Sequence, residues 1–445
     1  MQRFAVNALE KWKKSPERKP LVLYGARQVG KSWLMKEFGR LHFKNVLYVN
    51  FESDRDVHRY FERNSDPSII VPALSAEYKI RIDPKNTLII FDEIQECRRA
   101  MDSLKYFNEN APEYHVMAAG SLLGVASGGF PVGQVDLMTL YPLNFVEFLL
   151  AMGEDIPANV ILNGRRELAA ALHHKYLDLL KYYFYVGGMP EAVLRFTKGN
   201  KNFEAARTVQ NNILFSYYAD FAKHISAADV PKVRDIWDSI PNQFAKDNHK
   251  FTYSTVKPSA RGREYENAVR WLIDSGLVYS INRINLPNPA QLPLSAYRES
   301  SHFKMYILDI GLLACKSGLA LEAILDPSNT PFAHFKGSLT EQFVLQELVT
   351  VPELKIPGGY QIYYWGDWNS AEIDFVIQYE NSIIPVEVKS TVNLKAKSMQ
   401  TYMAKYNPAI AIRTSQMEYG KNSKGLYNIP LYGIGRFKEW AAVNR

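Results

Sequence analysis

The chain has 445 residues, of which 47% are hydrophobic and 22% are charged, so we expect about two to four globular domains. No stretch approaches the roughly eighteen uninterrupted apolar residues of a membrane span, and residues 1–19 lack the apolar centre of a signal peptide. Two cysteines exclude a disulfide framework, so we expect a cytoplasmic protein with no membrane partner. The formal net charge of +7 is compatible with nucleic acid but does not by itself indicate it.

Residues 20–32 carry a phosphate-loop pattern between a strand and a helix. The apolar run Leu21–Tyr24 predicts a buried strand, Gly-x-x-x-x-Gly-Lys-Ser follows, and apolar residues then recur at helical spacing. The glycines let successive N–H groups turn toward phosphate oxygens, at the positive end of the helix. Lys31 is predicted to reach the outer phosphates and Ser32 to hold magnesium; the alternative is a turn that binds nothing. The predicted nucleotide-binding residues are Gly25, Ala26, Arg27, Gln28, Val29, Gly30, Lys31 and Ser32.

A second motif, which is acidic, lies sixty residues beyond Ser32. Residues 87–91 form an apolar run typical of a buried strand, and Asp92 and Glu93 follow it directly. Asp92 is predicted to hold the water shell of a magnesium ion opposite Ser32, and Glu93 to polarise the water that attacks the terminal phosphate. An acidic strand end facing solvent is the alternative. Together the two motifs predict a part of the protein that binds ATP with Mg²⁺ and hydrolyses it.

Further segments extend this first domain. Residues 46–51, 114–119 and 135–140 predict strands, and their alternation with helices predicts a parallel, helix-covered sheet within a domain of residues 1–155. Ser121 follows one of these strands, where a polar side chain would sense the terminal phosphate; a small turn serine is nearly as good an explanation. Residues 156–245 predict a helical region, with one sharp interruption at Gly-Gly-Met-Pro, residues 187–190.

Residues 246–330 resemble a winged helix. An amphipathic helix is predicted before Gly276, and residues 277–281 and 303–308 predict two wing strands. Basic residues outnumber acidic ones near this helix, which suits a recognition helix on DNA phosphates, but a plain interdomain spacer fits equally well. The basic residues concerned are Lys246, Lys250, Lys257, Arg261, Arg263 and Arg270.

The last domain, residues 331–445, contains a second polar constellation. Residues 372–377 and 383–389 predict neighbouring strands, on which Glu387 and Lys389 share a face and Asp374 comes close to them. Carboxylate oxygens suit Mg²⁺ or Mn²⁺, and a lysine can orient an attacking water. This Asp-x12-Glu-x-Lys spacing resembles the PD-(D/E)xK nucleases, in which a first helix often supplies another carboxylate. Glu341 matches that carboxylate, although with Ser338 it also forms a capping-box pattern at a predicted helix start.

A half-exposed hairpin with a solvated charged face is the alternative for this constellation. The apolar character of the two strands argues for a central position in a sheet. A basic segment follows them and is a candidate phosphate track. Its basic residues are Lys395, Lys397, Lys405, Arg413, Lys421 and Lys424.

With both constellations in place, the chain resembles a prokaryotic family that pairs an AAA-type P-loop ATPase domain with a C-terminal domain of uncharacterised function, similar to restriction-endonuclease-like folds. The residues that carry the resemblance are 25–32, 91–95, 120–124, 141–145, 187–190, 303–311, 364–365, 371–375 and 386–390. The resemblance implies an α/β protein with an AAA-type core, a helical lid, a winged-helix-like middle and a nuclease-like C-terminal domain. It also implies that Ser121 is similar to a polar sensor and that Pro190 touches adenine.

Three hypotheses of different classes follow. In the first, the chain is an ATP-driven enzyme that acts on DNA, with Asp374, Glu387 and Lys389 as nuclease residues and Glu341, Asp374 and Glu387 as ligands of Mg²⁺ or Mn²⁺. In the second, it is a nucleotide switch whose C-terminal domain grips DNA or a protein without cutting. In the third, it is a chaperone-like ATPase that acts on protein. No arginine is a decisive arginine finger, so a neighbouring subunit of a homo-oligomer supplies one or turnover is slow.

Overall fold

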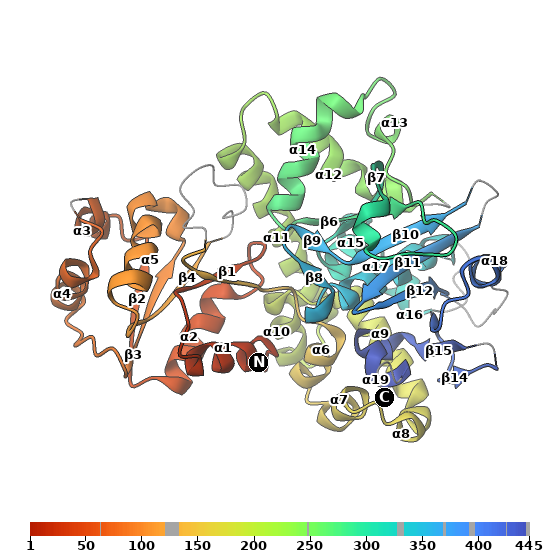
Figure 1. The fold of residues 1–445 in the computed structure, drawn as a ribbon, viewed down its shortest axis with the longest axis horizontal. Coiled ribbons are helices and arrows are strands. Elements are labelled where there is room, and N and C mark those ends of the chain that lie inside the picture. Colours follow the sequence, from red (N-terminus) through yellow and green to blue (C-terminus); the bar gives the residue numbers. More distant parts are fainter. Residues whose placement is uncertain are drawn as a thin grey trace. The chain divides into compact units, whose positions relative to one another are not determined.

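The computed structural model describes residues 1–62, 64–120, 133–246, 249–326, 333–367, 371–390, 397–423 and 425–441. This part of the chain divides into two units. Figure 1 shows the helices and strands of the chain, coloured along the sequence. The N-terminal unit comprises residues 2–142 and 274–277, and the C-terminal unit comprises residues 143–273 and 278–445. Among the described residues, no helix is long and apolar enough to cross a membrane.

A five-stranded parallel sheet forms the centre of the N-terminal unit. Its strand order is β2-β3-β4-β1-β5, so β4 lies between the strand that leads into the phosphate loop and the strand that ends in Asp92. Because every pair is parallel, the carboxyl ends of the strands, and with them both motifs, lie at one edge of the sheet. The predicted strands are confirmed. Their bounds are β1 Leu21–Tyr24, β2 Asn45–Asn50, β3 Thr87–Asp92, β4 His115–Ala119 and β5 Asp136–Thr139.

Helices cover both faces of this sheet, as its apolar strands require. On one face, Leu47 and Ile89 join a buried cluster with residues of α3, α4 and α5. Val46 and Leu88 precede Leu47 and Ile89 in their strands, so their side chains point to the other face. There, Gly39 of α2 approaches both of them. The predicted α/β arrangement is therefore confirmed. The helices are α1 Ala5–Lys14, α2 Lys31–His42, α3 Arg59–Glu62, α4 Pro67–Tyr78 and α5 Arg98–Asn110, with short 3₁₀ turns η1 Asp56–His58 and η2 Ile94–Glu96.

The C-terminal unit begins with the predicted run of helices. The Gly-Gly-Met-Pro motif separates α9 from α10, and Pro190 is the first residue of α10, where its missing N–H costs no helical hydrogen bond. The helices are α6 Phe145–Ala151, α7 Asp155–Leu162, α8 Arg166–Ala171, α9 His173–Val186, α10 Pro190–Lys198, α11 Phe203–His224, α12 Val230–Phe244, α13 Tyr253–Val256 and α14 Gly262–Asp274, the last residue of which is counted in the N-terminal unit.

One eight-stranded sheet runs through the rest of this unit, in the order β14-β15-β13-β12-β11-β10-β6-β7. The predicted wing strands are β6 and β7, and β6 pairs with β10, so they belong to the same sheet as the predicted nuclease strands β11 and β12. The latter two pair antiparallel in the interior of the sheet, as predicted. The strands are β6 Val278–Ile284, β7 Arg298–Ile307, β10 Ile362–Gly366, β11 Glu372–Tyr379, β12 Ser382–Val388, β13 Ala411–Ser415, β14 Gly420–Lys421 and β15 Leu426–Pro430, and a separate hairpin consists of β8 Lys355–Ile356 and β9 Gly359–Tyr360.

The remaining helices of the unit are α15 Ile310–Lys316, α16 Leu321–Leu325, α17 Ala333–Leu348, α18 Lys397–Tyr406 and α19 Phe437–Ala441, with 3₁₀ turns η3 Leu294–Tyr297, η5 Pro352–Leu354 and η6 Leu431–Arg436. The predicted capping box is wrong, because α17 begins before Ser338 and Glu341, which lie inside it. Their side chains are used for tertiary contacts instead. Ser338 donates to the carbonyl of Phe244 at 2.6 Å, and Glu341 joins an ionic cluster described below. The predicted boundary between residues 330 and 331 lies outside the described residues, and the four-domain division stays a prediction.

Candidate functional site

The phosphate loop closes tightly between β1 and α2. Gly25 and Gly30 have φ of 137° and 96°, and Gln28 has a φ of 67°, so the backbone turns through the left-handed region three times. A Cβ on Gly25 would lie 2.3 Å from the carbonyl oxygen of Leu140, so only glycine fits there. The loop is also braced by Arg3, which donates to the carbonyls of Val29 at 3.2 Å and Tyr141 at 2.7 Å. This role of Arg3 was not predicted, since it depends on contacts between segments that are distant in the sequence.

Lys31 lies buried at the first position of α2. Its ammonium donates to the carbonyl oxygens of Gly25 at 2.8 Å and Ala26 at 2.9 Å, so the loop itself holds it in place. Burial lowers the pKa of Lys31 to about 8, and the nearby carboxylates of Glu93 and Asp92 oppose that shift. The lysine and both predicted acidic residues are therefore close enough to interact electrostatically.

The acidic motif at the end of β3 is held by side chains of its neighbours. Asp92 is buried; its Oδ2 accepts a hydrogen bond from the hydroxyl of Tyr48 at 2.7 Å, and its Oδ1 accepts one from the N–H of Glu93 at 3.1 Å. Glu93 has a φ of 49°, and its Oε2 accepts from the amide of Gln95 at 2.6 Å. Tyr48 was not predicted, because its contact depends on the pairing of β2 with β3.

A magnesium ion with ATP suits this donor set. Ser32 opens α2 beside Lys31, and Asp92 presents a buried carboxylate at the same edge of the sheet, so hard oxygen donors are available from both motifs. Ser121 lies outside the described residues, and Pro190 belongs to the other unit, so both of their roles stay predictions.

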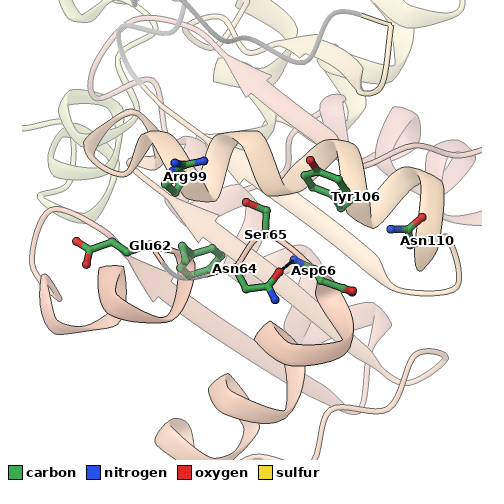
Figure 2. Close-up of a pocket in the computed structure, with 8 residues that line it drawn as sticks. Glu62, Asn64, Ser65, Asp66, Arg99, Tyr106 and Asn110 are labelled. Carbon is green, nitrogen blue, oxygen red and sulfur yellow. Dashed lines mark hydrogen bonds between the residues drawn. The ribbon is translucent and has the colours of Figure 1, made fainter.

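A pocket of 470 Å³ lies elsewhere in the N-terminal unit. Figure 2 shows Arg99 and Tyr106 on α5, facing the segment that joins α3 to α4. The pocket combines the cation of Arg99 with the carboxylates of Glu62 and Asp66. None of the described residues that line the pocket belongs to the phosphate loop. The nucleotide site is therefore located by the loop geometry and not by this pocket. The lining residues are Phe61, Glu62, Asn64, Ser65, Asp66, Arg99, Tyr106 and Asn110.

The predicted nuclease residues of the C-terminal unit form two groups. Glu387 is buried and its Oε1 lies 3.1 Å from the ammonium of Lys389, so the predicted proximity of the two side chains is confirmed, although Lys389 directly follows β12, which ends at Val388. The Oε2 of Glu387 finds no hydrogen-bond partner among the described residues, and burial raises its pKa. Asp374 accepts a hydrogen bond from the N–H of Val388 at 2.7 Å, yet its strongest charged neighbour is Glu341. Burial, followed by the charge of Glu341, raises the pKa of Asp374 to about 7.

Glu341 is already occupied by three donors. Its Oε1 lies 2.9 Å from the ammonium of Lys304 and also accepts from the hydroxyl of Tyr306, and its Oε2 lies 2.6 Å from Nδ1 of His249. Lys304 is buried and lies 2.7 Å from Glu372 as well. Among the described residues, no group of three His, Cys, Asp or Glu side chains is placed to hold a metal ion. The predicted trio of Glu341, Asp374 and Glu387 therefore does not fit a divalent ion in this arrangement, and we derive no reaction step through one.

Many of the predicted DNA-facing basic residues have partners within the fold. Lys246 donates to two threonine hydroxyls, Lys250 pairs with Glu372, Lys257 pairs with Asp235, and Arg270 lies 4.0 Å from Glu266. Arg261 and Arg263 remain exposed.

In the C-terminal track, Arg413 donates to Asn428. Lys405 and Lys421 are exposed and lie over the rings of Tyr406 and Tyr427 at 4.9 and 4.7 Å. Lys395 and Lys424 lie outside the described residues.

The geometry of the N-terminal unit is that of a P-loop nucleotide-binding domain. Residues 17–149 match a family model described as AAA domain, so the predicted AAA-type domain is confirmed. Residues 177–323 and 336–432 match two models described as Domain of unknown function (DUF8612) and Domain of unknown function (DUF4143). No curated protein matches the chain.

Three solved structures are similar over much of the chain. The Orc1 protein of Aeropyrum pernix, in complex with DNA, is 12% identical with a TM-score of 0.28, covering 71% of this chain and 90% of its own. ORC of Drosophila, bound to DNA, is 11% identical with a TM-score of 0.29, covering 68% and 91%. Protein VC1899 of Vibrio cholerae is 9% identical with a TM-score of 0.20, covering 96% and 99%. These TM-scores are too low for any property of the three proteins to be carried over.

Proposed function

We propose that the N-terminal unit binds ATP with Mg²⁺ and hydrolyses it. The observation that carries this proposal is the buried ammonium of Lys31, fixed by two carbonyls of the phosphate loop within the electrostatic reach of Asp92 and Glu93. A buried cation beside backbone N–H groups at a helix start is a site for phosphate oxygens. Magnesium, held through Ser32 and Asp92, would neutralise charge on the phosphates.

Each residue of the site has a distinct task in this proposal. Lys31 stabilises the negative charge that develops on the transferred phosphoryl group. Glu93 accepts a hydrogen bond from the attacking water and aligns it, and the amide of Gln95 fixes the carboxylate for that task. Tyr48 holds Asp92 in its orientation through the hydroxyl contact.

Turnover and binding of ATP, measured separately, test the proposal. We expect Lys31→Ala to lose both, and Glu93→Gln to keep binding while turnover falls by about a hundredfold or more, since general bases contribute on that scale. Glu96→Gln, three residues further along the chain, is the matched control and should turn over normally. A Glu93→Gln protein with normal turnover would exclude Glu93 as the catalytic base.

We further propose that the C-terminal unit binds DNA under the control of the nucleotide, without cutting it. The donors that occupy Glu341 argue against a metal-dependent nuclease centre. The exposed Lys405 and Lys421 carry the positive charge that suits the phosphates of a nucleic-acid strand. The partly exposed ring of Tyr427 lies beside Lys421, whereas the ring of Tyr406 beside Lys405 is buried.

The nuclease hypothesis remains the second candidate because of one observation: beside Lys389, the buried Oε2 of Glu387 has no hydrogen-bond partner in the part of the chain that the structure describes. Binding and cleavage of labelled single- and double-stranded DNA with Mg²⁺ or Mn²⁺, with and without ATP, separate the two. Binding without cleavage supports the switch. Cleavage that is lost in both Asp374→Ala and Lys389→Ala establishes the nuclease and overturns the switch.

A further inference from the structure

We infer that the ammonium of Lys304 is a resident cation of the C-terminal unit, which neutralises the carboxylates of Glu341 and Glu372 at the place where the sequence pattern predicts a divalent metal. This inference deepens the proposed non-cutting role of the unit and rests on it, but it is tested without DNA or ATP.

The position of Lys304 carries the inference. Its Nζ lies 2.9 Å from Oε1 of Glu341 on α17 and 2.7 Å from Oε1 of Glu372 on β11, and only 1% of the side chain is exposed. The ring of Tyr364 lies 5.2 Å from the same nitrogen and closes another side. The lysine thus bridges two carboxylates from separate elements, as a bound metal ion would.

The other carboxylate oxygens of this cluster are also occupied. Oε2 of Glu341 lies 2.6 Å from Nδ1 of His249, and Oε2 of Glu372 lies 3.2 Å from the ammonium of Lys250. A Mg²⁺ or Mn²⁺ ion requires about six oxygen ligands in a regular arrangement. To reach these oxygens it would have to displace Lys304 and break the contacts of its neighbours.

The charges of the cluster also balance without a metal. Two carboxylates, Glu341 and Glu372, face two ammonium groups, Lys304 and Lys250.

A third carboxyl, Asp374, also interacts with Lys304, but burial and the charge of Glu341 raise its pKa, which favours its neutral form. Against the effect of burial, the carboxylate of Glu341 raises the pKa of His249, which favours a further positive charge in the cluster. Little net negative charge is therefore left to attract a divalent cation.

Removing one partner of a buried ion pair leaves an uncompensated charge, which is strongly unfavourable. Loss of the Lys304 ammonium should therefore destabilise the protein and, at the same time, create an affinity for metal that the natural chain lacks.

Manganese binding and thermal unfolding of the nucleotide-free full chain test the inference. We expect the Tm of the wild-type protein to be unchanged by Mn²⁺ or by EDTA. Lys304→Ala should melt at a lower temperature, regain part of the loss with Mn²⁺, and bind Mn²⁺ in an electron paramagnetic resonance titration. Adding Glu341→Gln to Lys304→Ala should abolish the gain in Mn²⁺ binding, because it removes one of the carboxylates that the loss of Lys304 leaves uncompensated.

Two outcomes would overturn the inference. One is wild-type protein that binds Mn²⁺ in a manner lost in Glu341→Gln, and the other is a folded Lys304→Ala protein that gains no Mn²⁺ binding. If Lys304→Ala folds only when purified with Mn²⁺, the inference is supported, and if it does not fold at all, Lys304→Gln repeats the test with less loss of volume. Mn²⁺ binding and thermal unfolding are measured without ATP or DNA. Failure of the proposed ATP turnover or DNA binding can therefore be distinguished from failure of this inference.

Discussion

The carboxylate of Asp309 accepts a hydrogen bond from the backbone N–H of Gly188, with 2.6 Å between Oδ2 and the nitrogen. The other oxygen, Oδ1, accepts from the N–H of Leu312 at 3.0 Å and so caps α15. The amide of Gln346 on α17 lies 3.2 Å from Oδ2. A single buried carboxylate therefore ties the Gly-Gly-Met-Pro turn to two helices that follow more than a hundred residues later.

The start of the C-terminal unit joins the same group of contacts. The N–H of Leu143 donates to the carbonyl of Gly188 at 2.7 Å, and the N–H of Phe145 donates to Oε1 of Glu347 at 2.8 Å. Three of the motifs that carry the family resemblance, at residues 141–145, 187–190 and 303–311, thus meet in this buried polar junction. These contacts give Leu143, Gly188 and Asp309 a structural role in the folded protein.

Asp309→Ala should destabilise the protein substantially. The change leaves the buried N–H groups of Gly188 and Leu312 without their acceptor, and each such loss costs about 1–3 kcal/mol, so we expect about 2–6 kcal/mol in total. Urea unfolding followed by circular dichroism measures the difference. Asp309→Asn, which keeps one acceptor oxygen, should lose less, and equal losses in the two variants would contradict this account.

Gly188→Ala should prevent normal packing of the same turn. A Cβ at this position would lie 2.0 Å from the carbonyl oxygen of Leu143, and that backbone atom cannot move aside without breaking the junction. We expect a lowered Tm and a reduced yield of folded protein. Gly359→Ala is the matched control in the same unit, because a Cβ there has no atom within 4 Å among the described residues, and its Tm should stay close to that of the wild type.

Glu347→Gln should change how stability depends on pH. Burial raises the pKa of Glu347 to about 8 in the folded protein, from an ordinary value of 4.5. A carboxyl whose pKa is raised by folding favours the folded state while it is protonated. Its contribution is therefore full below about pH 4.5 and is lost as the pH rises toward 8.

The measurement is the free energy of unfolding of both proteins between these two pH values. The glutamine is neutral throughout and keeps an oxygen for the N–H of Phe145, so the variant should gain stability relative to the wild type as the pH rises. A difference that is constant with pH would show that Glu347 is already ionised in the folded protein.

Local sequence patterns were sufficient for the elements that depend on neighbouring residues. The strand, loop and helix around Gly25 and the buried strand before Asp92 were predicted correctly because periodicity and glycine placement determine them. Contacts between distant segments were not predicted. Tyr48 reaches Asp92 only through strand pairing, and Lys304 meets Glu341 only because β7 and α17 pack in one unit. For the same reason the capping-box interpretation of Glu341, which is a local argument, was wrong.

Tyr48→Phe tests whether the support of Asp92 matters for catalysis. The change removes the hydroxyl that donates to Oδ2 of Asp92 at 2.7 Å but keeps the ring, over which the ammonium of Lys36 lies at 3.6 Å. A hydrogen bond to a charged group contributes about 1.5–3 kcal/mol, so we expect kcat for ATP hydrolysis to fall by about tenfold or more and the Mg²⁺ requirement to rise.

The control is Tyr78→Phe. This change removes a tyrosine hydroxyl that donates to the carboxylate of Asp54 in the same unit, and neither residue belongs to the phosphate loop. Burial, more than the neighbouring carboxylate, raises the pKa of both tyrosines, so the two changes are chemically matched. A loss of stability without a loss of kcat in Tyr48→Phe would mean that the tyrosine only packs the sheet. A loss of kcat in Tyr48→Phe alone would identify it as a positioning residue for the magnesium carboxylate, because the matched change elsewhere in the unit leaves the chemistry intact.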